Sequence, residues 1–218
     1  MKLLILQISS FLYLIPLLIG VTKYSSLDKR EKSFFLFILF SALVAAGLVI
    51  TRGLGNNLYF FYLFALGEAL ILPFFLVEKG KWKDLKKWFG IYLVVLLAIL
   101  AGEIFLRDGG LKNFNNLSLS ANALILGAFA VRTLLVLRYD TMVDNLAKSS
   151  IFWFALGLCF YYFGNFLIYG VSKFYQDTDL QILTNLYDFR LFTIYFSVIA
   201  YTIGFLKIKS GPRKVAFS

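Results

Sequence analysis

Apolar residues form seven long runs along this chain, separated by short stretches that are polar or rich in glycine. Each run is close to the roughly 20 residues that an α-helix needs to cross the hydrocarbon core of a bilayer. The predicted spans are residues 3–20, 33–50, 58–77, 88–106, 117–137, 150–171 and 185–206. No connection between them is long enough for a separate domain. The pattern therefore predicts an all-α, polytopic membrane protein, with residues 1–218 forming a single domain, a seven-transmembrane-helix bundle.

The composition supports lipid as the solvent of this fold. Apolar residues make up 60% of the chain and charged residues 16%, against about 25% charged residues in a soluble domain. A soluble fold of 218 residues could not bury that much apolar surface. The net charge of +10 lies in the loops, where it serves as an orientation signal and attracts anionic headgroups. Nucleic acid is therefore not an expected partner.

The basic residues predict which side of the membrane each loop faces. Fifteen of the 22 Lys and Arg residues fall in loops 22–32, 78–87 and 138–149 and in the tail after the last span, and five fall on the other side. Because basic loops stay in the cytoplasm during insertion, we expect the N-terminus outside and the C-terminus in the cytoplasm. All three tryptophans also fall at the inner boundary.

The first span could instead be a cleaved signal peptide. Its apolar run is long, however, and no small-x-small cleavage pattern precedes Lys23. Cleavage would also place the basic loop 22–32 outside. We therefore expect the first span to remain.

Several kinds of chemistry are not expected. The chain has one cysteine, Cys159, and no histidine, which excludes an intramolecular disulfide and removes the usual ligand of haem and zinc. The scattered carboxylates form no catalytic constellation. We therefore predict no catalytic residues, no metal site and no cofactor.

Glu68 is the most informative polar residue, because it lies near the centre of the third span. Its neighbours on the same helix are all apolar: Phe61, Phe64, Ile71, Leu72 and Phe75. The carboxyl group must therefore hold a proton or pair with a group from another helix. Arg132 in the fifth span is a candidate partner. Glu68 could also serve only to hold helices together, with Arg132 reaching the inner headgroups.

The sixth span carries a polar stripe. Tyr161, Asn165 and Tyr169 are four residues apart and so share one face of the helix. Gly157 and Gly164 lie beside them and would allow close helix packing. The stripe predicts a polar cavity, although packing alone would account for the glycines.

The seventh span is polar on two faces. One face carries Asn185, Asp188, Tyr195 and Thr202, and the other carries Arg190, Ser197, Tyr201 and Gly204. Such a helix should be central or line water, although its two charges also lie close to the outer end.

Polar residues at similar depth predict a pocket that opens outward above Glu68. The members of this set are Glu103, Asn122, Asn165, Tyr169, Asp188 and Arg190. Glu103 also fits a residue at the wetted boundary of the fourth span.

Two familiar seven-helix classes are excluded. Retinal proteins need a lysine in the middle of the last span, and this chain has none there. Sugar transporters with a three-one-three plan need proline-containing repeats, whereas Pro16 and Pro73 are the only prolines within spans.

Short motifs resemble a widespread, largely uncharacterised family of bacterial seven-helix integral membrane proteins. They are Asn56-Asn57 followed by Glu68, Ser149-Ser150-Ile151-Phe152-Trp153, and Tyr162-Phe163-Gly164-Asn165. The resemblance covers residues 33–206. In that family a histidine often lies early in the last span and a carboxylate early in the fifth. Here Asp188 and Arg190 occupy the first region and Asn122 the second.

The resemblance implies a stand-alone, sensor-like protein of the bacterial cytoplasmic membrane, similar in layout to the membrane input regions of some sensor kinases. We therefore expect a receptor-like protein that binds a small molecule or lipid in an outward-facing pocket. Glu68 would be the buried switch, and loop 78–87 would contact a cytoplasmic signalling partner. The sequence leaves two alternatives open: a small-solute or proton-coupled transporter that uses Glu68, and a lipid- or isoprenoid-modifying enzyme.

Overall fold

The computed structural model describes residues 12–51, 58–77, 82–106, 116–139, 145–175 and 180–208. Within these ranges the chain is helical and contains no strand. The α-helices are α2 (Leu14–Lys23), α3 (Lys29–Ile50), α4 (Tyr59–Leu76), α5 (Trp82–Phe105), α6 (Asn116–Tyr139), α7 (Ser150–Tyr175) and α8 (Leu180–Leu206). Two short 3₁₀ helices, η1 (Tyr24–Ser26) and η4 (Leu146–Lys148), precede α3 and α7.

Six of the described helices, α3 to α8, are long and apolar enough to cross a membrane. The prediction of an all-helical, multi-pass membrane architecture is confirmed for these six segments. The first predicted span, 3–20, is described only in its second half, where α2 lies. Residues 3–11 of that span fall outside the described residues, as do Lys79 and Lys81 of the basic loop 78–87.

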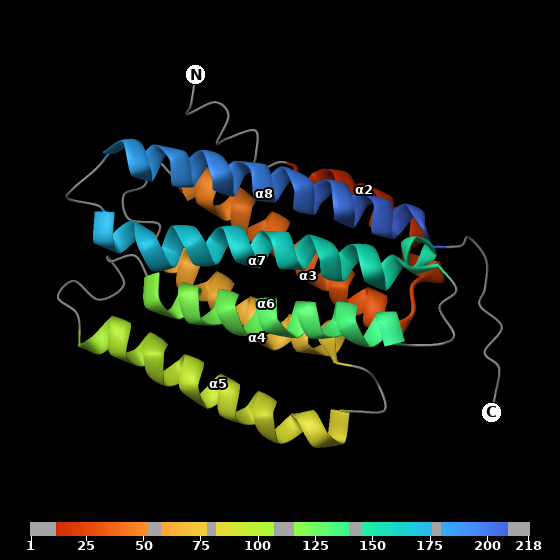
Figure 1. Cartoon of the computed structure of the whole chain (residues 1–218), viewed down its shortest axis with the longest axis horizontal. Coiled ribbons are helices and arrows are strands. Elements are labelled where there is room, and N and C mark those ends of the chain that lie inside the picture. Colours follow the sequence, from red (N-terminus) through yellow and green to blue (C-terminus); the bar gives the residue numbers. More distant parts are fainter. Residues whose placement is uncertain are drawn as a thin grey trace.

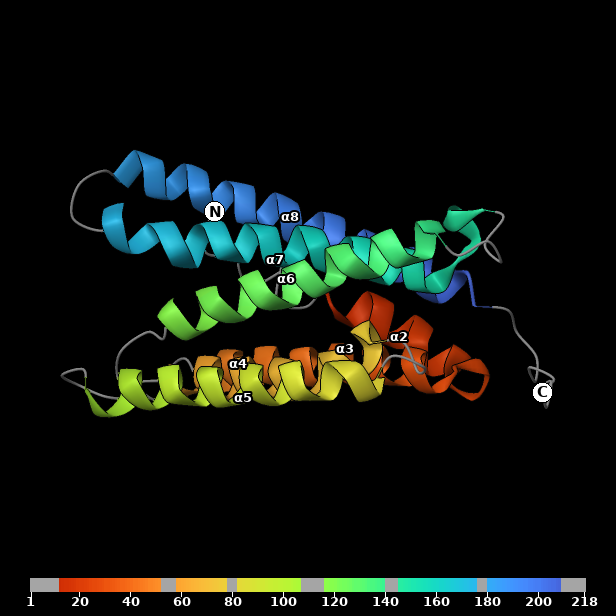
Figure 2. The same cartoon turned by 60° about the horizontal axis from the view of Figure 1, so that its bottom comes forward.

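Figures 1 and 2 show long helices running side by side in two layers. Helices α6, α7 and α8 form one layer, and α3, α4 and α5 form the other (Figure 2). Helix α7 packs extensively against both α6 and α8, and α3 packs against α4. Helix α5 lies at one side of the bundle, mainly against α6.

One end of the bundle is fastened by polar contacts among three helices. Asp28 and Glu31 form a capping box that begins α3, which satisfies backbone N–H groups that the first turn leaves unpaired. The hydroxyl of Ser150, the first residue of α7, donates to Glu31 Oε1 at 2.6 Å. Arg30 donates from Nε to the Phe75 carbonyl near the end of α4. We call this the Glu31 end.

The opposite end, where α5 ends and α6 begins, is joined by Glu103. Its carboxylate accepts hydrogen bonds from the backbone N–H groups of Leu117 at 2.9 Å and Ser118 at 3.2 Å. An anion at a helix N-terminus is stabilised by the unpaired N–H groups and the helix dipole. Only 3% of Glu103 is exposed, so it is buried at a helix terminus rather than at a wetted boundary. We call this the Glu103 end.

The apolar side chains divide between the core and the outer surface. Phe34, Phe75, Phe154 and Phe205 are buried together near the Glu31 end, with the Phe34 and Phe154 rings stacked 4.1 Å apart. Leu43, Phe74 and Phe192 are more than half exposed. An outer surface this apolar is suited to contact with acyl chains rather than water.

Candidate functional site

Glu68 lies in the middle of α4 and is only 2% exposed. Its carboxyl group accepts a hydrogen bond from Asn122 Nδ2 of α6 at 2.9 Å and another from the Tyr162 hydroxyl of α7 at 3.2 Å. The side chain of Tyr161 also lies near this carboxyl group. The acid is therefore enclosed by neutral donors from other helices.

Asn122 extends this network to a fourth helix. Its Oδ1 atom accepts from the Tyr92 hydroxyl of α5, and its Nδ2 atom also lies 3.4 Å from the Ala65 carbonyl of α4. Glu68, Asn122, Tyr92 and Tyr162 are each at most 5% exposed. We refer to these four residues as the Glu68 network, which joins α4, α5, α6 and α7.

Arg132, the partner considered from the sequence, is not one of the groups that contact Glu68. It follows Asn122 by ten residues on α6, a distance of about 15 Å along the helix axis. Its side chain is half-buried nearer the Glu31 end. The sequence could show that Glu68 needs a partner, but not which helix lies beside it.

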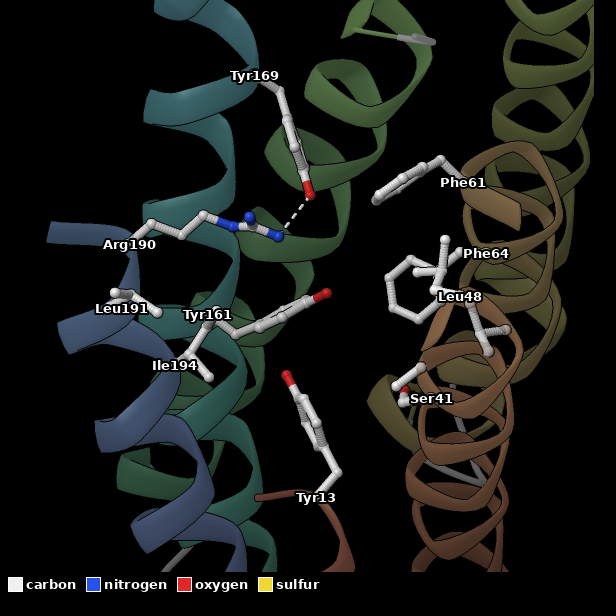
Figure 3. A pocket seen from close by; sticks show the side chains of 12 residues that line it. Tyr13, Ser41, Leu48, Phe61, Phe64, Tyr161, Tyr169, Arg190, Leu191 and Ile194 are labelled. Carbon is white, nitrogen blue, oxygen red and sulfur yellow. Dashed lines mark hydrogen bonds between the residues drawn. The ribbon is translucent and has the colours of Figure 1, made fainter. Parts of the chain in front are cut away.

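A cavity of about 210 Å³ lies between the two helix layers, beside the Glu68 network (Figure 3). Its apolar lining comes mainly from α3 and α4, and its polar lining mainly from α7 and α8. The lining residues are Tyr13, Ser41, Val44, Ala45, Leu48, Phe61, Phe64, Tyr161, Tyr169, Arg190, Leu191 and Ile194. Phe61 and Phe64 fall in the first two turns of α4, so the cavity lies toward the Glu103 end.

Arg190 of α8 provides the positive charge of the cavity. Its Nε atom donates to Asn165 Oδ1 at 3.0 Å, and its Nη2 atom donates to the Tyr169 hydroxyl at 2.9 Å. The guanidinium carbon also lies 5.3 Å from the centre of the Tyr169 ring. Figure 3 shows the Arg190 side chain reaching into the cavity toward Phe61 and Phe64.

Tyr161 connects the cavity to the Glu68 network. Its ring lines the cavity, and its hydroxyl points into it (Figure 3). The same side chain lies near Glu68, although Glu68 does not line the cavity. A solute that displaced Tyr161 would therefore change the surroundings of the buried acid.

The structure brings most of the predicted site residues to these two neighbouring features. Tyr161, Tyr169 and Arg190 line the cavity, and Asn165 holds Arg190. Asp188 is exposed and Tyr195 half-buried, and neither lines the cavity. Two residues correspond to about 200° around an α-helix, so Asp188 points away from Arg190, as the sequence indicated.

Sequence reasoning missed three tyrosines. Tyr92 and Tyr162 belong to the Glu68 network, and Tyr13, just before α2, lines the cavity. A tyrosine deep within a predicted span carries a hydroxyl that needs a partner. That signal, weighed equally with the charged residues, would have identified all three.

Comparisons with protein-family models, curated proteins and solved structures find no match to this chain. The part of the chain that the structure describes has no group of three or more Cys, Asp or Glu residues arranged to hold a metal ion. The described lining of the cavity offers hydroxyl groups and one guanidinium beside a largely apolar surface.

Proposed function

We propose that this protein is a receptor-like protein of the bacterial cytoplasmic membrane, which binds a small molecule or lipid in the cavity between its helix layers. Occupancy would be relayed to a cytoplasmic signalling partner. The observation that carries this proposal is the position of Tyr161, which borders both the cavity and the buried carboxyl group of Glu68. Membrane-embedded acids are costly and usually functional.

Enclosure of Glu68 favours a switch over a carrier. Its carboxyl group is bound by Asn122 and Tyr162 and does not border the cavity. A group in this position can respond to a ligand through Tyr161 without contacting it. With the predicted orientation, the cavity lies on the outer side and the basic loops face the cytoplasm. The resemblance to a family similar to sensor-kinase input regions agrees with this layout.

Native mass spectrometry of gently purified protein tests the binding step. We expect a small molecule to be retained and then lost in Phe64→Trp, because the larger ring fills the cavity. Leu63→Trp is the matched control: Leu63 is the preceding residue and is exposed on the lipid side of α4, so this variant should retain the molecule. A cavity empty in all preparations would contradict the proposal.

Co-purification of a cytoplasmic partner tests whether occupancy of the cavity is relayed across the membrane. We expect a cytoplasmic protein to co-purify and to be lost when Lys79, Lys81 and Lys83 are neutralised together. Its recovery should also change in Tyr161→Phe, which removes the hydroxyl beside Glu68 and keeps the ring. A partner that is unaffected by both changes would argue against a relay.

A proton-coupled transporter is the second candidate, favoured by the presence of a cavity beside a membrane-embedded acid. Uptake of a solute into proteoliposomes that collapses in Glu68→Gln would establish transport and overturn the receptor proposal. We expect no such uptake.

A further inference from the structure

Arg190 limits the chemistry of what the cavity can hold. It is the only charged side chain among the described residues that line the cavity. Opposite it, the lining is apolar and includes Phe61, Phe64 and Leu48 (Figure 3). The cavity is therefore amphipathic, with a cationic side on α8 and an apolar side on α3 and α4.

The guanidinium is held in a defined orientation. Asn165 and Tyr169 of α7 accept from Nε and Nη2, and both side chains are at most 7% exposed. Both of these contacts come from neutral groups, and they fix the orientation of the guanidinium. An oriented guanidinium in a low-dielectric environment binds a carboxylate strongly, because its planar donors match the two carboxylate oxygens.

The size of the cavity sets the size of the ligand. A cavity of about 150 Å³ holds one benzene molecule, so the 210 Å³ available here accommodates on the order of ten non-hydrogen atoms. That is enough for a carboxylate with one ring or a short chain. It is far too little for a whole phospholipid.

Phosphate fits the cavity less well than carboxylate. A phosphate group carries a charge near −2 at neutral pH and is usually bound by clusters of basic residues or by rows of backbone N–H groups. Here the described lining offers one cation and three tyrosine hydroxyls, from Tyr13, Tyr161 and Tyr169. This donor set suits a single negative charge.

We infer that the cavity is a binding site for a small carboxylate with an apolar body of about ten non-hydrogen atoms in all. Arg190 binds the carboxylate, and Phe61, Phe64 and Leu48 contact the apolar body. This inference rests on the proposed function, and it names the class of ligand.

Binding of benzoate to the protein in phosphatidylcholine nanodiscs tests this inference. We expect benzoate to bind at least about tenfold more tightly than benzamide, which has the same shape without the charge, since a hydrogen bond to a charged group is worth roughly that factor. Hexanoate and hexanamide should show the same difference. This comparison uses the natural chain and depends on no variant.

Variants of the two arginines within predicted spans identify which positive charge binds the carboxylate. Arg190→Gln should weaken benzoate binding by about tenfold or more and leave benzamide binding unchanged. Arg132→Gln removes a half-buried arginine from α6, away from the cavity, and should leave both affinities unchanged. Arg190→Lys keeps the charge but loses the planar donors, so its benzoate affinity should fall between those of the natural chain and Arg190→Gln.

Competition tests the assigned size of the ligand. Oleate has about twice as many non-hydrogen atoms as the cavity accommodates, so it should leave benzoate bound, and displacement of benzoate by oleate would overturn the size assignment. Inorganic phosphate that competes as well as hexanoate would overturn the carboxylate assignment.

Failure of this inference can be told apart from failure of the receptor proposal. Equal binding of benzoate and benzamide, unchanged in Arg190→Gln, overturns the carboxylate class and leaves a receptor for neutral molecules. Arg190-dependent benzoate uptake into proteoliposomes that also requires Glu68 supports the carboxylate class and overturns the receptor.

Discussion

Glu68 illustrates how a single carboxyl group can be accommodated in the middle of an apolar helix. Its described hydrogen-bond partners are an amide from α6 and a hydroxyl group from α7. These groups have few alternative partners in a membrane interior, where water is scarce. The hydrogen bonds of the Glu68 network therefore favour one relative placement of the helices over others.

Removal of the Glu68 carboxyl group should destabilise the bundle. Glu68→Ala leaves the donors of Asn122 and Tyr162 without their acceptor and opens a small cavity, so we expect a loss of about 2–4 kcal/mol in the free energy of unfolding. Glu68→Gln keeps the shape and one acceptor, and should lose about 1 kcal/mol. Thermal and denaturant unfolding in detergent would measure both.

Leu70→Ala is the matched control for these variants. Leu70 lies two residues from Glu68 on the same helix and is 52% exposed on the outer surface. We expect it to lose less than Glu68→Ala. Equal losses would show that the Glu68 network adds no stability beyond ordinary packing.

At this scale the sequence could identify which residues need partners, but not who the partners are. The burial of Glu68 among apolar neighbours follows from its position in a span. Its contact with Asn122 depends on the order of helices around the bundle and on the register of α4 against α6, and neither is encoded in the periodicity of a single helix. Arg132 was considered because its charge is complementary, although its position along α6 places it too far away.

At the scale of helices, the interface between α7 and α8 depends on small residues. A Cβ atom added at Gly164 would lie 2.9 Å from Thr193 Cβ and closer still to its hydroxyl oxygen. Gly164 therefore allows the two helix backbones to approach closely, as small residues commonly do in membrane bundles.

Substitution of Gly164 should separate these helices. Gly164→Ala forces Thr193 or the backbone to shift, with an expected loss of about 1–3 kcal/mol. Gly90→Ala is the control, because a Cβ atom at Gly90 meets nothing within 4 Å and alanine has the higher helix propensity. Unfolding experiments on the pair should show a loss only for Gly164→Ala; a similar loss for both would contradict the packing argument.

Glu103 should stabilise the beginning of α6 from outside that helix. Glu103→Gln removes the negative charge at the helix N-terminus, and we expect a loss of about 1 kcal/mol. Hydrogen exchange should become faster at the N–H groups of Leu117 and Ser118 and should stay unchanged in the middle of α6. Uniformly faster exchange along α6 would indicate global destabilisation instead.

Hydropathy placed the six described long helices well but began some of them too late. The second predicted span begins at residue 33, whereas α3 begins at Lys29. The difference arises because its first turn is polar and is fixed by the Asp28 and Glu31 side chains. Likewise, α8 begins at Leu180 rather than at residue 185. At α3, capping extends the helix beyond the apolar run that identifies it.

At the scale of the whole molecule, the predicted orientation can be tested with single cysteines. In a Cys159→Ser background, Ser25→Cys should react with a membrane-impermeant maleimide only in inverted vesicles, and Gln181→Cys only in intact cells. Both natural side chains are exposed. The reverse labelling pattern would place the cavity on the cytoplasmic side of the membrane.

The polar contacts at the Glu31 end have a mechanical consequence. They join α3, α4 and α7 at the end of the bundle opposite the cavity. A ligand that separates the two helix layers would therefore tilt the helices about this joined end. A tilt of about 2° over a helix of about 30 Å displaces the free tip by about 1 Å, while the joined base hardly moves. A protein bound at the joined end would therefore encounter a change in the angle between the helices rather than a change in their separation.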